Sequence, residues 1–289
     1  MRFITYKSGS SAGLALSTPE GYYGLAEADP DYPGSLQYLL YNQLLSDAAD
    51  VLKSKGKVLD PGSFLHLPPL RFPSKIICVG LNYVEHAKEA SFDKPTYPVL
   101  FARFSSTLVG HEQPIMRPFL SEQLDYEGEL VAVIGKTGRH ITKDKALEHV
   151  AGYSIFNDAS IRDYQFKSLQ WTMGKNFDCT GAFGPEFVSK DELPAGAVGL
   201  QLTTRVNGEL MQSANTRDMI FDIAELVATI SAGMTLFPGD IIVTGTPAKV
   251  GYTQDPPIFM KKGDLCKVQI EGIGVLSSPI IDEQPAPYC

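Results

Sequence analysis

The chain has 289 residues, of which 44% are hydrophobic, and a formal net charge of −8 at pH 7. This length allows one large domain, or a large and a small one, with a sizeable core. The negative charge argues against a nucleic-acid-binding surface, and no apolar run approaches the roughly 18 to 20 residues that span a membrane. We therefore expect no nucleic-acid partner and no membrane partner.

The N-terminus and the cysteines indicate the compartment. Residues 1–6 alternate like a strand and lack the apolar core of a signal peptide. Cys78, Cys179, Cys266 and Cys289 form neither a CxxC pair nor a zinc-binding spacing, so we expect reduced thiols. With no targeting segment visible, the sequence predicts a cytoplasmic protein, or a mitochondrial-matrix protein if the source is eukaryotic.

The first segment predicts a small α/β unit. Strand candidates at Phe3–Tyr6, Ala12–Leu16 and Tyr22–Leu25 precede a single helix candidate with apolar residues at helical spacing. Ser35 can cap the start of this helix and Gly56 can end it. The segment holds few acids or bases at suggestive spacings, so we expect a structural or dimer-supporting role for it.

A proline-rich stretch follows. Three prolines fall within residues 68–73, where they stiffen the chain and prevent regular strand pairing. We place the domain boundary there, with a small N-terminal domain at residues 1–70 and a catalytic domain at residues 73–282. After residue 75, strand candidates outnumber helix candidates, which favours a β-rich barrel or rolled sandwich.

A buried strand candidate, Lys75–Gly80, leads into the first candidate site residues. A helix that follows it would place His86 and Glu89 on one face. A lone His–Glu pair is usually a solvated surface pair. Directly after a buried strand, and next to Gly80 and Asn82, it is a better candidate for a functional site.

Two carboxylates share one face of a later strand. Glu127 and Glu129 are two residues apart and run into the apolar stretch Leu130–Ile134, so their side chains point the same way. Such a pair is more often a solvated strand end, but it can also hold a hard cation such as Mg²⁺, Mn²⁺ or Ca²⁺. Asp158 ends the strand candidate Gly152–Asp158, where it can cap a following helix or act as a third ligand.

The rest of the chain adds a short helix at residues 143–149, a glycine-punctuated loop at 171–178, a hairpin turn at Asn207-Gly208 and an amphipathic helix at 218–230. Segments 87–97 and 163–173 are expected to form lids or walls over the site.

Together these residues outline a possible catalytic site. Three carboxylates can hold one cation with open coordination positions, and His86, oriented by Glu89, can act as a general base. Lys175 and Arg162 can neutralise substrate charge, and Thr246 offers a hydroxyl in a tight turn. Each also has a simpler role: Arg162 can pair with an acid, Lys175 can be solvated, and Thr246 can cap its turn.

The order of seven motifs resembles the fumarylacetoacetate hydrolase superfamily. The resemblance is greatest to its shorter branch, which contains acylpyruvate hydrolases, oxaloacetate decarboxylases and 2-hydroxyhepta-2,4-diene-1,7-dioate isomerase-like proteins. The motifs are specific for the superfamily and much less so for the reaction, and the resemblance covers residues 73–280. They are Cys78–Glu89, Asp125–Leu130, Gly152–Gln165, Gly174–Asp178, Val206–Glu209, Pro238–Pro247 and Gly263–Gly274.

The resemblance implies an α+β, β-rich fold: a mixed β-roll or barrel-like catalytic domain with a small N-terminal α/β domain, usually as a homodimer. It also implies Mg²⁺ or Mn²⁺, with Ca²⁺ as an option, held by Glu127, Glu129 and Asp158. His86 and Glu89 match the family's water-activating dyad. Lys175 matches the lysine near the scissile carbonyl, and the substrate-binding residues expected are Gly80, Asn82, Arg162, Gln165 and Thr246.

Two positions depart from the family pattern. Arg103 stands where many members have lysine, at a position expected near the site entrance. Lys249 stands where glycine is usual and adds bulk and charge beside the Thr246 turn. Both departures bear on the substrate more than on the fold.

The sequence therefore predicts a metal-dependent hydrolase that cleaves the C–C bond of an acylpyruvate-type 1,3-diketo acid, a small anionic 2-oxo acid. Water activated by His86 and Glu89 attacks the distal carbonyl, Lys175 stabilises the oxyanion, and a metal-stabilised pyruvate enolate leaves. Decarboxylation of oxaloacetate or another β-keto acid, and enol–keto isomerisation, are alternatives on the same site. The non-enzymatic alternative is a metal-stabilised scaffold that binds a small acid.

Overall fold

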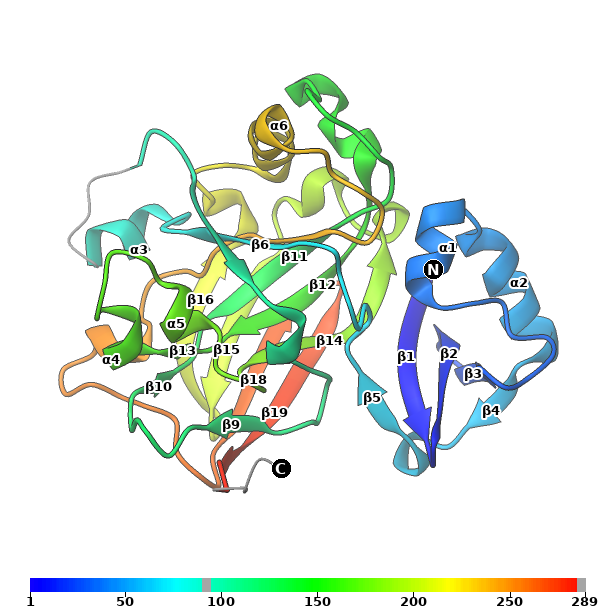
Figure 1. Ribbon diagram of the computed structural model, residues 1–289, viewed down its shortest axis with the longest axis horizontal. Helices are drawn as coiled ribbons and strands as arrows, with labels where there is room; N and C mark the ends of the chain where they lie inside the picture. Colours follow the sequence, from blue (N-terminus) through cyan, green and yellow to red (C-terminus); the bar gives the residue numbers. More distant parts are fainter. Residues whose placement is uncertain (90–94, 285–289) are drawn as a thin grey trace.

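The N-terminal strands and helices form a small lobe beside a larger one in the computed structural model (Figure 1), which describes residues 1–89 and 95–284 apart from the side chains of residues 86–88. The three predicted N-terminal strands are confirmed. The strands of this lobe are β1 (Arg2–Ser8), β2 (Ser11–Thr18), β3 (Gly21–Ala26), β4 (Lys57–Leu59) and β5 (Leu65–Leu67).

The single helix expected in this lobe is two helices, α1 (Leu36–Asn42) and α2 (Leu45–Lys55). Ser35 caps α1 with its side chain, and Gly56 is the C-cap of α2, as predicted. The helix breaks at Gln43, whose backbone is left-handed with φ of 59°. The apolar spacing therefore identified the buried face correctly but not the break.

One long sheet runs through both lobes, because β1 pairs antiparallel with β14 of the larger lobe. Its strand order is β4-β3-β2-β1-β14-β12-β11-β17-β6-β7, with β5 also on β1 and β8 on β14. The division into two domains near residue 70 stays a prediction. The larger-lobe strands are β6 (Ile76–Gly80), β7 (Val99–Arg103), β8 (Leu108–Val109), β11 (Gly128–Ile134), β12 (Val150–Asp158), β14 (Gly181–Ser189) and β17 (Ile241–Val243).

A second sheet of five strands has the order β16-β15-β18-β19-β9. The predicted hairpin turn is confirmed, with positive φ at Asn207 and Gly208 between β15 and β16. The fold is β-rich as expected, but the sheets are not closed into a barrel. The strands are β9 (Ile115–Arg117), β15 (Gln201–Val206), β16 (Glu209–Asn215), β18 (Leu265–Ile270) and β19 (Gly274–Asp282), and β10 (Leu124–Asp125) pairs separately with β13 (Ser160–Ile161).

Helices of the larger lobe are short except for one. The helix expected at 218–230 is α6, which begins later because Asp222, not Asp218, caps it. The stretch 143–149 is a 3-10 helix, and the expected loop at 171–178 contains a helical turn.

No helix among the described residues is long and apolar enough to cross a membrane. The helices are α3 (Val84–Glu89), α4 (Arg162–Gln165), α5 (Thr172–Lys175) and α6 (Ile223–Gly233).

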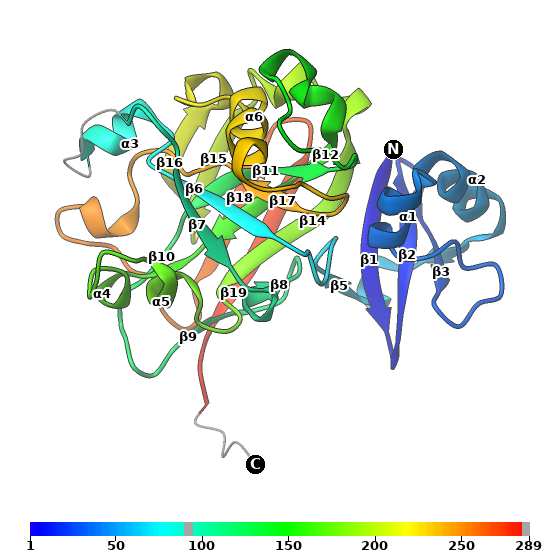
Figure 2. The same cartoon turned by 45° about the horizontal axis from the view of Figure 1, so that its top comes forward.

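Strand β11 lies at the centre of the larger lobe (Figure 2), where every one of its residues is buried. It pairs with β12 on one side and β17 on the other. Leu130 on one face packs in the main core, and Val131 on the other packs in the core beneath the N-terminal helices. A strand held on both faces and both edges gives the residues at its start a rigid base.

The lobes also meet at His66 of β5, whose ring packs edge-on against His111 with 4.8 Å between ring centroids. Burial and, second, the nearby His111 lower the pKa of His66 from 6.5 to about 4. The native state therefore keeps His66 neutral, whereas the unfolded chain takes up a proton below pH 6.5. The free energy of unfolding is therefore not reduced by His66 above pH 6.5, and it falls as the pH drops from 6.5 to 4.

The wild type should lose free energy of unfolding between pH 7.5 and pH 4.5. We expect His66→Phe to lose less than the wild type, by up to about 3 kcal/mol, because it has no imidazole to protonate in the unfolded chain. Urea unfolding at both pH values measures it. His140→Asn, a change at an exposed histidine, is the control and should keep the wild-type dependence. An unchanged pH dependence in His66→Phe would contradict the assignment.

Candidate metal centre

The antiparallel pairing of β11 with β12 gathers the three carboxylates expected to bind metal. Gly128 pairs with Asn157, and the Asp158 N–H donates to the Glu127 carbonyl at 2.9 Å. The carboxylates of Glu127, Glu129 and Asp158 each offer an oxygen within 4.8 Å of the others. All three side chains are buried, so they do not form a solvated strand end.

Asp158 does not cap a helix. Helix α4 begins only at Arg162, after Ile161. One Asp158 oxygen instead accepts from the guanidinium of Arg103, and the other accepts from Lys175 at 2.5 Å. Arg103 is 2% exposed, so the expectation that it lies near the site entrance is wrong: it lies beneath Asp158, where it also donates to Thr180 at 2.7 Å.

Lys175 is buried against the carboxylates, not solvated. It extends from α5, and its ammonium lies 2.6 Å from Glu127 and 2.5 Å from Asp158. Burial lowers the pKa of Lys175, but the attraction of Asp158 and Glu127 outweighs burial and raises that pKa overall. The ammonium thus provides part of the positive charge that the buried carboxylates require.

Arg162 is held by side chains that the sequence pattern only partly revealed. Its Nε donates to Asp125 at 2.8 Å, its Nη1 to Gln165 at 2.7 Å, and its Nη2 lies 2.6 Å from Glu127. Asp125 also accepts the backbone N–H of Gly251 at 2.7 Å. The signal in the sequence was the spacing, because Asp125 lies two residues before Glu127, and in the structure both carboxylates contact the Arg162 guanidinium.

Glu129 forms no ion pair within the part of the chain that the structure describes, and its carboxylate accepts the Gly245 N–H at 2.5 Å. Burial, then the negative charges of Asp158 and Glu127, raise its pKa well above the usual range.

The whole cluster has four buried carboxylates, Asp125 included, against the three buried cations Arg103, Arg162 and Lys175. With all four carboxylates ionised the cluster has one excess negative charge, and this charge with all-oxygen donors fits a hard divalent cation such as Mg²⁺ or Mn²⁺.

The turn containing Thr246 is fixed by a residue that the sequence did not indicate. Thr246 donates to the Gly128 carbonyl at 3.1 Å and accepts from Gln212 at 2.9 Å. Gln212 also accepts the Gly128 N–H at 3.1 Å. It comes from β16, and no local motif marks a contact between strands so distant in sequence.

Asn82 is fully buried and bonded to backbone. Its amide nitrogen donates to Thr244 at 2.7 Å and to Phe221 at 3.1 Å, and its oxygen accepts the Phe221 N–H at 2.8 Å. These bonds support the segments around the site, and Asn82 does not line the cavity there. Its substrate-binding role stays a prediction.

A small cavity of about 30 Å³ lies over the cluster. Most of the predicted site residues meet there, together with Phe101 and Trp171, which the sequence did not single out. The lining residues are Val79, Gly80, Leu81, Phe101, Glu127, Glu129, Arg162, Gln165, Trp171, Lys175 and Thr246.

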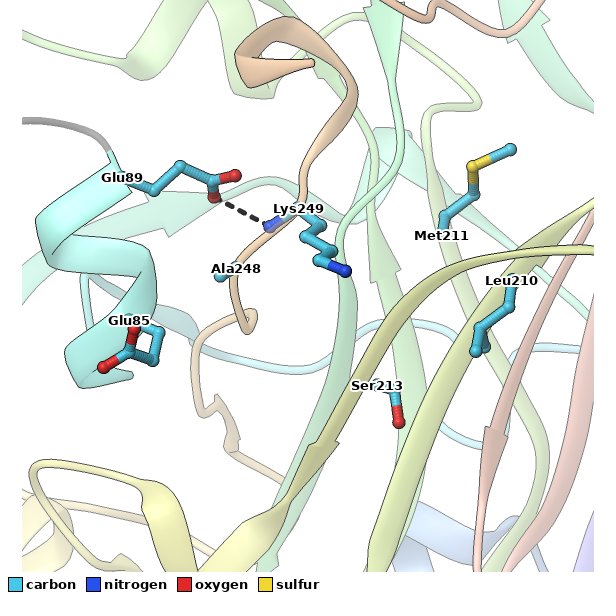
Figure 3. Close-up of a pocket in the computed structure, with 7 residues that line it drawn as sticks. All are labelled: Glu85, Glu89, Leu210, Met211, Ser213, Ala248 and Lys249. Carbon is cyan, nitrogen blue, oxygen red and sulfur yellow. Dashed lines mark hydrogen bonds between the residues drawn. The ribbon is translucent and has the colours of Figure 1, made fainter.

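Glu89 of the predicted dyad borders a different, larger cavity of about 590 Å³ (Figure 3). Its carboxylate accepts the backbone N–H of Lys249 at 2.7 Å, and the φ of Lys249 is 70°, in the left-handed region that favours glycine. The side chain of His86 lies outside the described part of the structure. The dyad therefore stays a prediction. Glu85, Leu210, Met211, Ser213 and Ala248 complete the lining.

Residues 75–281 match the fumarylacetoacetate (FAA) hydrolase C-terminal family, and the chain belongs to that family. It is an enzyme of a superfamily whose members are hydrolases, decarboxylases or isomerases. It is 38% identical to the human mitochondrial oxaloacetate tautomerase FAHD2A, over 97% of this chain and 92% of that protein.

Two solved structures are similar over nearly the whole chain. The fumarylacetoacetate hydrolase of the psychrophilic Exiguobacterium antarcticum has a TM-score of 0.86 and 37% identity, covering 98% of this chain and 100% of that one. The maleylpyruvate hydrolase of Sphingobium sp. SYK-6, in complex with manganese(II) and pyruvate, has a TM-score of 0.80 and 27% identity, with the same coverage.

Replacing Glu129 by glutamine tests the metal assignment. Glu129→Gln keeps an oxygen for the Gly245 N–H but removes a carboxylate that burial and its neighbours disfavour. We expect the metal-free protein to gain about 1 to 2 kcal/mol in stability, and to lose most of the rise in Tm that Mg²⁺ or Mn²⁺ produces.

Thermal unfolding with and without each metal measures both effects. Glu209→Gln, at an exposed residue of β16, is the matched control and should respond to metal like the wild type. A full metal-dependent rise in Glu129→Gln would show that the cation binds elsewhere.

Proposed function

We propose that this protein catalyses keto–enol tautomerisation of oxaloacetate or a closely related short 2-oxo diacid, with the help of a divalent cation. The observation that carries the proposal is the position of Lys175. Its ammonium contacts two of the three clustered carboxylates inside the small cavity, where Glu89 is not among the lining residues. The site thus offers a proton-transfer group beside the cluster, and the similarity to an oxaloacetate tautomerase supports this reaction.

The residues that would hold the cation are Glu127, Glu129 and Asp158, because they supply three buried oxygen donors with excess negative charge. A cation held there would supply positive charge that stabilises the negative charge developing on the 2-oxo oxygen.

The chain's own groups perform the proton transfer. In the enol-to-keto direction, the Lys175 ammonium donates a proton to carbon 3 of the substrate and recovers the proton that leaves the oxygen on carbon 2. No atom is gained or lost overall. Arg162 keeps Glu127 and Gln165 in place through its bonds to both side chains, and Thr246 closes the wall of the cavity.

Lys175→Met is expected to lower kcat for enol-to-keto conversion of oxaloacetate at least about 100-fold, because general acid–base catalysis is lost. Loss of the enol's ultraviolet absorbance, corrected for the uncatalysed rate, measures it. The variant should still show a metal-dependent rise in Tm, since all three carboxylates remain.

Lys167→Met, a change at an exposed lysine of the same segment, should keep wild-type turnover. Wild-type kcat in Lys175→Met would rule out this role for the lysine. Release of carbon dioxide from oxaloacetate at a rate matching the loss of enol would favour decarboxylation instead.

Hydrolysis of acylpyruvates is the second candidate, and the position of α3 favours it. This helix begins three residues after Leu81, which lines the cavity with Gly80, so the segment that carries His86 and Glu89 is continuous with the cavity wall. The similarity to a maleylpyruvate hydrolase supports this reaction class.

The two reactions depend differently on the dyad. We expect His86→Ala to abolish any hydrolysis of acetylpyruvate, because water loses its base, while enol-to-keto conversion of oxaloacetate stays within about threefold of wild type. Parallel assays on the two substrates measure this. Full acetylpyruvate hydrolysis by His86→Ala would remove the dyad from the mechanism, and equal loss of both reactions would assign His86 to tautomerisation as well.

A homodimer, and a location in the cytoplasm or the mitochondrial matrix, are further parts of this proposal. The name of the human relative supports the mitochondrial location for a eukaryotic source.

A further inference from the structure

The chain has a single tryptophan, Trp171, and its ring lies on the wall of the cavity above the carboxylates. A Cβ atom added at Gly80 would lie 2.4 Å from Cζ3 and 2.8 Å from Cη2 of the indole, so the ring lies directly on the glycine backbone. The indole also packs edge-on against Phe101, with 5.4 Å between ring centroids. Gly80 thus makes room for the indole.

The cavity beneath this ring is too small for a substrate. Its volume of about 30 Å³ is enough for one or two water molecules, whereas sites for small ligands usually have some 300 to 1,000 Å³. A 2-oxo acid can reach the carboxylates only if part of the wall is displaced.

The cavity lining places aromatic rings directly beside charged groups. Phe101 and Trp171 line it together with the carboxylates and Lys175, and the Lys175 ammonium lies 5.1 Å from the centroid of the Phe101 ring. A 2-oxo acid bound at the carboxylates would therefore have these rings beside its far end, and the indole is the larger of the two.

Trp171 is carried by a segment with mostly local bonds. Among the described contacts of residues 167–170, Ser168 bonds to Gln170, and Lys167 lies over the ring of Tyr164. Leu169 is 97% exposed. Few buried contacts make a segment easy to displace.

The base of the segment is firmly packed. A Cβ atom at Gly174 of α5 would lie 2.4 Å from the backbone nitrogen of Gln165 in α4. The indole can therefore move while Arg162, Gln165 and Lys175 remain in place.

We infer that Trp171 is the specificity-determining residue of this site. Its indole covers the cluster when no substrate is bound, moves outward when a 2-oxo acid enters, and limits the group at the far end to a short one such as a carboxymethyl. The substrate class is therefore short 2-oxo acids, and long or aromatic acylpyruvates are excluded. This inference rests on the proposed function. It restricts the 2-oxo acid substrates proposed there to those with a short group at the far end.

The first test needs no turnover. Oxalate is an unreactive diacid with the chelating half of a 2-oxo acid, and Trp171 is the only source of tryptophan fluorescence. With Mg²⁺ present, we expect oxalate to shift the emission to longer wavelength and to increase acrylamide quenching, because the ring becomes exposed. Calorimetry on the same sample measures binding.

Two outcomes would overturn the inference here. One is oxalate binding with emission and quenching unchanged, and the other is no oxalate binding by either the wild type or Trp171→Ala. Binding by Trp171→Ala alone would support the inference, because removing the indole would open the site.

The second test measures selectivity. For Trp171→Ala, we expect the ratio of kcat/KM for benzoylpyruvate to that for oxaloacetate to rise at least about tenfold. Leu169→Ala, on the same segment but exposed, should keep the wild-type ratio. Trp171→Phe should give an intermediate ratio, and it replaces the alanine variant if that variant does not fold.

An unchanged ratio in both Trp171 variants would overturn the inference while leaving the proposed reaction intact. An oxalate-dependent fluorescence change without turnover of either substrate would instead overturn the proposed reaction and leave the gating role of Trp171 supported.

Discussion

The structure of the site depends on the burial of several carboxylates at one end of β11. A carboxylate removed from water is costly unless positive charge or hydrogen bonds compensate it. Lys175 and Arg103 provide that charge to Asp158, and Arg162 provides it to Glu127 and Asp125. These cations come from β7, α4 and α5, so the electrostatic requirement of one strand fixes where the neighbouring elements must lie.

Much of the site followed from simple periodicity. The alternation of side chains along a strand placed Glu127 and Glu129 on one face, and the next strand returned Asp158 to the same end. The roles of Ser35, Gly56 and Asn207-Gly208 were equally predictable, because each residue acts on a turn within a few residues of itself. Sequence patterns predict these features because the interactions that form them lie between residues close together in the chain.

The remainder depended on contacts between distant segments. Gln212 on β16 bonds to the Thr246 turn, and Arg103 lies beneath Asp158, although nothing in either local sequence marks these contacts. The break at Gln43 interrupts an otherwise regular apolar pattern. The family resemblance named residues that the structure brings together around the cavity, but the contact of Trp171 with Gly80 depends on how distant segments pack, which spacing does not encode.

The pairing of β1 with β14 has a consequence for the edge of the main sheet. The match to the family model begins at residue 75, yet the hydrogen-bonded ladder of the sheet continues into β1. Without the N-terminal lobe, Phe187 and Val188 of β14 would lose their strand partner, and unpaired edges with apolar side chains promote aggregation. The N-terminal lobe therefore covers that part of the sheet edge, which a chain without the lobe would leave open to pairing with another strand.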